Sequence, residues 1–162
     1  MKQFEPAVLA LGDVLRLRGL MLVTAESCTG GLIAAACTAV AGSSDWFERG
    51  FVTYSNEAKS ELLGVDAKQI AEFGAVSAEV ARAMADGALG RSPASLAVAV
   101  TGIAGPGGAT PGKPVGTVWL AVARRGLPAS AECLQLDGDR AAVREQTVHR
   151  ALERLLQLAR KG

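Results

Sequence analysis

The chain has 162 residues, of which 49% are hydrophobic, and it carries 17 Lys and Arg against 16 Asp and Glu. This composition supplies one sizeable core and argues against intrinsic disorder. A net charge of +1 and an aromatic content of only 4% argue against nucleic-acid binding, because they provide little phosphate attraction and few stacking platforms.

Hydrophobic periodicity predicts helices alternating with strands along the first part of the chain. In chain order we expect a helix at 6–18, a strand at 20–23, a helix at 32–40, a strand at 50–54, helices at 56–63, 66–73 and 77–89, a strand at 95–101, two strands at 115–123 and 131–136, and a closing helix at 139–161. The last two strands follow each other closely enough to be antiparallel neighbours. This order predicts an α/β fold, a three-layer α/β/α sandwich with a mixed sheet, as a single domain over residues 1–162.

No apolar run is long enough to cross a bilayer, since the longest covers residues 32–41. The N-terminus carries acidic residues within its apolar pattern and does not look like a signal peptide. The three cysteines, Cys28, Cys37 and Cys133, are an odd number and form no CxxC pair, so neither a disulfide framework nor a zinc site is expected. We therefore expect a cytoplasmic protein with reduced thiols, no membrane partner, no metal and no cofactor.

Ser27 is the first candidate for chemistry, because it lies between an apolar strand and a glycine-rich helix start. Side chains at such a turn face the carboxyl edge of the sheet, where open α/β folds bind ligands. The helix N-terminus is expected to supply free N–H groups for an anion. The same residues also suit a simple helix N-cap, and from the segment alone both interpretations stay open.

A serine needs a base, and the single histidine, His149, falls inside the closing helix, away from any loop motif. A Ser-His-Asp triad is therefore poorly supported. Lys59 could replace histidine if burial lowers its pKa, and Tyr54 could relay or orient its proton. The alternative, which these residues alone favour, is a solvated lysine beside Glu57 and Glu61.

Residues 101–108 follow a buried strand and form the start of a Gly- and Pro-rich loop whose backbone N–H groups could bind phosphate. Residues 107–113 match the spacing of a P-loop, but Pro114 replaces the required Ser or Thr, so we reject that motif. The alternative is a surface loop. Arg140 opens the last helix, where the helix dipole disfavours a cation, and one interpretation is that it serves a ligand phosphate. The alternative is that Arg140 and Arg144 are two solvated arginines.

Several segments together resemble the CinA C-terminal domain family. They are residues 24–31 (TAESCTGG), 50–59 (GFVTYSNEAK), 74–77 (GAVS), 101–106 (TGIAGP), 114–118 (PVGTV) and 138–140 (GDR). The resemblance spans nearly the whole chain and departs from the family chiefly in the Pro- and Gly-rich residues 109–113. Stand-alone members of the family are nicotinamide-nucleotide amidohydrolases, whereas larger members carry an additional N-terminal domain.

The resemblance implies hydrolysis of nicotinamide mononucleotide to nicotinate mononucleotide and ammonia through an acyl-enzyme, in the recycling of pyridine nucleotides. It assigns Ser27 as nucleophile, Lys59 as its base and Tyr54 as an assisting hydroxyl. The substrate-binding residues it implies are Cys28, Thr29, Gly30, Gly31, Thr101, Gly102, Ile103, Ala104, Gly105 and Arg140. A non-catalytic nucleotide-binding domain and an amidase for another substrate are the alternatives, and a homo-oligomer is left open.

Overall fold

The computed structural model describes residues 1–161 and contains one five-stranded sheet in the order β2-β1-β3-β4-β5. The strands are β1 (Leu22–Glu26), β2 (Phe47–Val52), β3 (Leu96–Gly102), β4 (Thr117–Arg124) and β5 (Ser130–Gln135). β1 pairs in parallel with both β2 and β3, whereas β4 runs antiparallel to β3 and β5. The carboxyl ends of β1, β2 and β3 therefore meet at one edge of the sheet.

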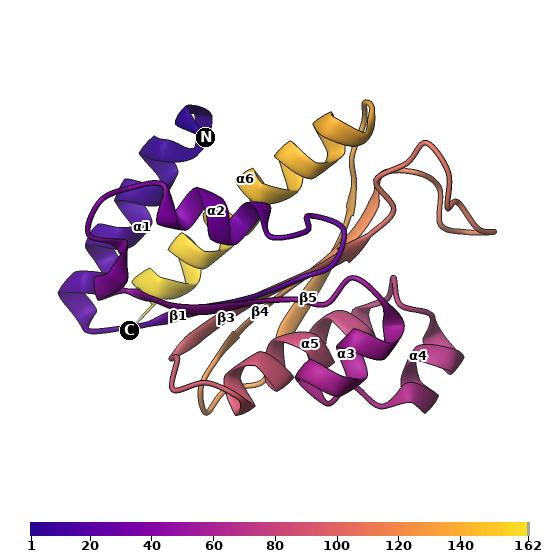
Figure 1. The fold of residues 1–162 in the computed structure, drawn as a ribbon, viewed down its shortest axis with the longest axis horizontal. Coiled ribbons are helices and arrows are strands. Elements are labelled where there is room, and N and C mark those ends of the chain that lie inside the picture. Colours follow the sequence, from indigo (N-terminus) through magenta and orange to yellow (C-terminus); the bar gives the residue numbers. More distant parts are fainter. Residues whose placement is uncertain (162) are drawn as a thin grey trace.

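Six α-helices cover the two faces of this sheet, as Figure 1 shows. α1 (Glu5–Arg18), α2 (Leu32–Thr38) and α6 (Arg140–Arg160) lie on one face, and α3 (Asn56–Leu63), α4 (Ala67–Phe73) and α5 (Ala78–Gly90) lie on the other. Two short 3-10 helices occupy Lys2–Phe4 and Ser43–Asp45. The predicted three-layer α/β/α sandwich with a mixed sheet is confirmed.

Side-chain alternation in the central strands explains the two layers of core. In β3, Leu96, Val98 and Val100 face the α1/α6 side, whereas Ala97 and Ala99 face α5. All five are fully buried, so both faces of the strand are covered. The small alanines let α5 approach the sheet closely. α3 and α4 in turn pack against α5.

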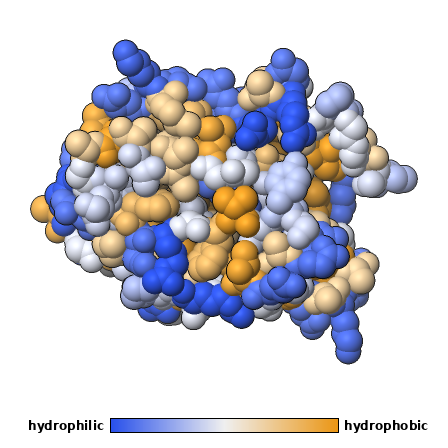
Figure 2. Space-filling model, viewed as in Figure 1, coloured by the Kyte–Doolittle hydropathy of each residue, from blue (hydrophilic) through white to orange (hydrophobic). Residues whose placement is uncertain are grey.

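The molecular surface in Figure 2 shows apolar residues broken up by hydrophilic ones on the viewed face. Large exposed apolar side chains include Val52, Tyr54 and Leu127. Within residues 1–161 no helix has the length and apolarity that a membrane crossing requires.

The predicted elements all exist, but the bounds of three strands were wrong by two residues or more. The first strand runs from Leu22 to Glu26 rather than from 20 to 23, because the polar side chains of Thr24 and Glu26 are fully buried in it. The second covers Phe47–Val52 rather than 50–54, and the fourth begins at Thr117 rather than 115. The shift of the first strand matters most, because it makes Ser27 the residue directly after the strand.

Candidate active site

Ser27 lies at the carboxyl edge of the sheet, directly after β1. Its backbone N–H donates to Val100 O of β3 (3.0 Å), and the N–H of Thr53 donates to Glu26 O (2.9 Å). These bonds tie the ends of three neighbouring strands together. The side chain of Ser27 is consequently fixed beside residues that follow β2 and β3.

Lys59 approaches Ser27 from α3, a helix that begins at the N-cap Ser55, whose side chain accepts from the N–H of Ala58 (3.0 Å). The amine nitrogen Nζ of Lys59 lies 3.0 Å from Ser27 Oγ. It also donates to three backbone oxygens of the β2–α3 connection, Thr53 O (3.0 Å), Tyr54 O (3.3 Å) and Ser55 O (3.5 Å). The sequence alone favoured a solvated lysine here, but Lys59 is only 1% exposed.

Burial lowers the pKa of Lys59 from its ordinary value, because removal from water disfavours the charged ammonium. A neutral amine has two N–H donors and one lone pair. The two nearer backbone oxygens, Thr53 O and Tyr54 O, can take the two donors, which leaves the lone pair for the hydroxyl proton of Ser27. Together with the lowered pKa, these contacts suit Lys59 to act as a general base.

A cavity of about 210 Å³ opens over this pair. Of the residues predicted for the site, it is lined by Ser27, Cys28, Tyr54, Lys59, Thr101, Gly102, Ala104 and Arg140. The predicted Thr29, Gly30, Gly31, Ile103 and Gly105 lie next to these in the chain but do not line the cavity.

Sequence reasoning missed three lining residues, Asn56, Ala75 and Val76. Asn56 opens α3, and the other two belong to the turn before α5, which Thr101 holds by donating from Oγ1 to Ala75 O (3.0 Å). Both segments were among the matched motifs, so the motifs themselves were the available signal. Neither an amide nor two small apolar residues indicates chemistry by residue type.

Arg140 reaches the cavity from the first turn of α6. Its guanidinium donates to Gly105 O (2.9 Å) and to the hydroxyl of Tyr54 (3.0 Å). Within residues 1–161 no carboxylate forms an ion pair with Arg140, so its charge is free to meet an anionic ligand. The hydroxyl of Tyr54 thus faces Arg140, and its hydrogen bonds within the described chain include none to Lys59 or Ser27.

The prediction that the N-terminus of α2 offers free N–H groups to a ligand was wrong. The N–H groups of Ile33 and Ala34 donate to the carboxylate of Glu26 (2.8 and 3.0 Å). A side chain of the protein therefore occupies this helix end. Candidate oxyanion donors must come from the preceding turn instead.

Cys28 lies next to Ser27, but its thiol is not activated as a nucleophile. Burial raises the pKa of its thiol to about 11, and burial likewise raises the pKa of Cys37 to about 12. Both thiols are therefore protonated near neutral pH, and a protonated thiol is a poor nucleophile.

His149 lies in α6, outside the cavity over Ser27, and its ring centroid is 4.7 Å from that of Phe4.

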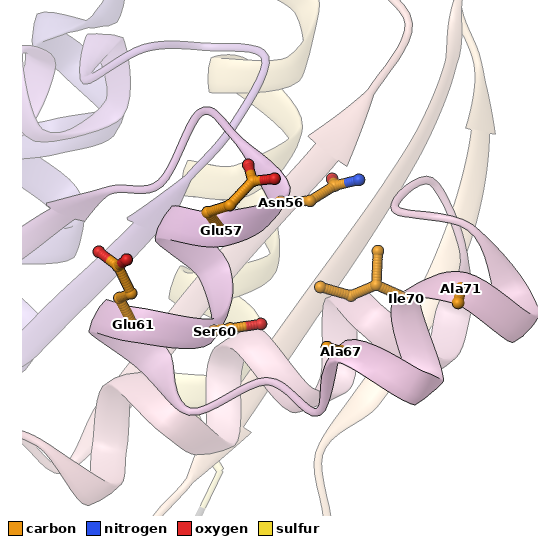
Figure 3. Close-up of a pocket in the computed structure, with 7 residues that line it drawn as sticks. All are labelled: Asn56, Glu57, Ser60, Glu61, Ala67, Ile70 and Ala71. Atoms are coloured by element: carbon orange, nitrogen blue, oxygen red, sulfur yellow. The ribbon is translucent and has the colours of Figure 1, made fainter.

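A larger cavity of about 410 Å³ lies between α3 and α4. Figure 3 shows Ser60 directed toward Ile70 and Ala67, with Glu57 and Glu61 on another side of α3. Asn56 lines this cavity as well as the one over Ser27. The α3–α4 cavity contains neither Ser27 nor Lys59, so we place the chemistry in the smaller one.

The arrangement at the sheet edge agrees with the sequence motifs, and a family model for the CinA C-terminal domain matches residues 5–159. The chain belongs to the CinA C-terminal domain family. Within that family it is 56% identical to the "Nicotinamide-nucleotide amidohydrolase PncC" of Pseudomonas putida, over 91% of this chain and 92% of the relative.

The family also contains longer proteins. A "CinA-like protein" of Citrifermentans bemidjiense is 58% identical over 88% of this chain, but the match covers only 34% of that protein. Among solved structures, that of the competence/damage inducible protein CihA from Agrobacterium tumefaciens superposes with a TM-score of 0.93 at 49% identity, covering 96% of this chain and 94% of that one. This chain therefore shares its α/β/α fold with that solved structure.

Proposed function

We propose that this chain hydrolyses the carboxamide of nicotinamide mononucleotide, giving nicotinate mononucleotide and ammonia. The observation that carries the proposal is the 3.0 Å contact between Lys59 Nζ and Ser27 Oγ, made by a lysine whose pKa is lowered by burial. The choice of substrate rests on the name of the Pseudomonas putida relative, which shares nearly the full length of this chain.

In the acylation step, neutral Lys59 takes the hydroxyl proton of Ser27 while Oγ attacks the carboxamide carbon. The carbonyl oxygen becomes an oxyanion, which backbone N–H groups of the turn after Ser27 stabilise. When the intermediate collapses, the C–N bond breaks and protonated Lys59 delivers its proton to the departing nitrogen. Ammonia leaves, and the acyl group remains on Ser27.

Deacylation uses the same groups in the same order. Neutral Lys59 takes a proton from water, and the resulting oxygen nucleophile attacks the acyl carbon. Protonated Lys59 then returns its proton to Ser27 Oγ as the ester bond breaks, which releases the carboxylate product. The positively charged pyridinium ring of the substrate withdraws electrons from the carboxamide, so the proposed chemistry assigns no step to a metal.

Arg140 is the residue we assign to the phosphate of the substrate. Its guanidinium lines the cavity, and its partners are neutral oxygens rather than a carboxylate. Tyr54 contributes by orienting this guanidinium through its hydroxyl. The resulting activity, carried by residues 1–162 as one amidohydrolase domain in the cytoplasm, belongs to the recycling of pyridine nucleotides.

The test is ammonia release from nicotinamide mononucleotide, nicotinamide riboside and nicotinamide, measured in parallel. The proposal predicts rapid release from the mononucleotide and slow release from the two compounds that lack phosphate. Release from other amides only would make the chain an amidase for another substrate. Binding of the mononucleotide without turnover would make it a non-catalytic nucleotide-binding domain.

A further inference from the structure

Glu26 is a buried carboxylate for which the proposed mechanism has no use. Its side chain is fully buried, at 0% exposure, and within residues 1–161 no cation pairs with it. Three donors satisfy it instead, namely the hydroxyl of Thr29 (2.6 Å) and the N–H groups of Ile33 (2.8 Å) and Ala34 (3.0 Å). A carboxylate is costly to bury, so such a fully satisfied one indicates a specific task.

These bonds connect the last residue of β1 to the turn that follows it. Thr29 is fixed at a second atom, because Arg144 of α6 donates from Nη2 to Thr29 O (3.1 Å). Two further bonds close the turn, from the N–H of Gly30 to Ser27 O and from the N–H of Leu32 to Thr29 O, both at 3.0 Å. The turn after Ser27 is thus held on both sides.

The N–H groups of Cys28, Thr29 and Gly31 are left over in this turn, since within residues 1–161 none of them has an oxygen acceptor. Those of Cys28 and Thr29 follow Ser27 directly, and Cys28 lines the cavity next to it. N–H groups of buried residues are nearly always paired, so two that have no oxygen acceptor beside a nucleophile are suited to receive an oxygen from a ligand.

We propose that Glu26 is a positioning residue, which acts through Thr29 to hold the N–H groups of Cys28 and Thr29 where the oxyanion forms. The inference rests on the proposed amide hydrolysis for its reaction, and it adds a residue that touches neither substrate nor Ser27 Oγ. Glu26 is not the base itself, because its carboxylate already accepts three hydrogen bonds while Ser27 Oγ is bonded to Lys59.

The experiment compares Glu26→Gln, Thr29→Val and Thr29→Ser with the wild type, with kcat and KM measured for the mononucleotide across pH. Glu26→Gln and Thr29→Val should lower kcat by roughly 100-fold, because oxyanion donors lose their alignment, while KM stays within about twofold. Thr29→Ser keeps the hydroxyl and should recover most of kcat. The pH midpoint should not move in any variant, because Lys59 remains the base.

Thr38→Val is the matched control. Thr38 Oγ1 donates to Ala34 O (2.8 Å), so this variant removes a side-chain hydrogen bond from the same helix, away from the turn. Its kcat should equal that of the wild type. An equal loss in Thr38→Val, a normal kcat in folded Glu26→Gln, or a shifted pH midpoint in Glu26→Gln would overturn the proposal. Where Glu26→Gln does not fold, the Thr29→Val and Thr29→Ser pair decides, and equal activities would overturn it.

A second readout separates this inference from the choice of substrate. A phosphonofluoridate reacts with an activated serine, whose oxygen bonds to phosphorus as fluoride leaves, and the phosphoryl oxygen occupies the oxyanion position. Labelling of Ser27 should slow in Glu26→Gln and Thr29→Val but not in Thr38→Val. This result is expected even if nicotinamide mononucleotide is the wrong substrate, whereas unchanged labelling rates would contradict the role of Glu26.

Discussion

Lys59 Nζ lies 3.0 Å from Ser27 Oγ although 32 residues separate the two in the chain. Ser27 is placed by β1 and Lys59 by α3, and α3 rests on α5, which packs on β3 and β4. The distance between the two reacting atoms therefore depends on how closely α3 can approach α5.

Gly87 sets that approach, because a Cβ atom at this position would come within 2.0 Å of Leu63 O in α3. Gly87→Ala should push α3 away, lower stability by about 1–3 kcal/mol and lower kcat as Lys59 is displaced. Urea unfolding and ammonia release measure the two effects.

Gly90→Ala is the control from the same helix, since a Cβ there meets nothing within 4 Å. It should leave kcat unchanged and raise stability by about 0.4–1 kcal/mol through the lower entropy of the unfolded chain. Equal kcat in Gly87→Ala and Gly90→Ala would show that α3 is not held by this contact.

The lowered pKa of Lys59 predicts how stability depends on pH. Between that lowered value and the ordinary value of 10.5, the unfolded chain binds a proton at Lys59 that the folded chain does not. Stability should therefore rise with pH through this window and fall as pH decreases through the folded pKa. In Lys59→Met this contribution is absent, so the difference in slope between wild type and variant, from urea unfolding at several pH values, measures it. Identical slopes would mean that Lys59 stays charged in the folded protein.

Arg140→Ala should weaken binding of the mononucleotide more than it slows turnover. Loss of a charge-assisted contact costs about 1.5–3 kcal/mol, roughly a 10- to 150-fold rise in KM. Tyr54→Phe should give a smaller rise in KM, because Arg140 keeps its bond to Gly105 O. Arg150→Ala, on an exposed part of α6, is the control and should leave KM unchanged. A collapse of kcat in Tyr54→Phe would instead give its hydroxyl a direct part in proton transfer.

Thiol reagents should not abolish activity. Cys133 is exposed, whereas Cys28 and Cys37 are buried with raised pKa values, so a single thiol should react rapidly in the folded protein. Counting fast-reacting thiols while following ammonia release checks this, with Cys133→Ser as the control that removes the fast phase. Inactivation that follows modification of Cys28 would contradict the prediction.

The layers of the fold were predictable because apolar runs and glycine-rich turns recur at element boundaries. The end of β1 was not, since Thr24 and Glu26 are polar and look like loop residues. The burial of Glu26 depends on hydrogen-bond partners, the N–H groups of Ile33 and Ala34, which only the folded chain brings to its carboxylate.

The candidate site shows the same limit. Residue types and motifs pointed to Ser27 and Lys59, but the lowered pKa of Lys59 comes from tertiary packing that leaves its side chain only 1% exposed. Packing between segments that are far apart in the chain cannot be predicted from a local sequence pattern. For the same reason, the pairing of Tyr54 with Arg140, 86 positions later, became visible only in the structure.

The most direct test of the account is the kcat/KM for ammonia release from nicotinamide mononucleotide in Ser27→Ala, Lys59→Met and the double variant, each shown to be folded. The account predicts that each single variant loses most turnover and that the double variant loses little more, because the two side chains act as one unit. Wild-type kcat/KM should rise with pH to a plateau reached below the ordinary lysine pKa of 10.5. A folded Lys59→Met protein with near-normal turnover would contradict the account.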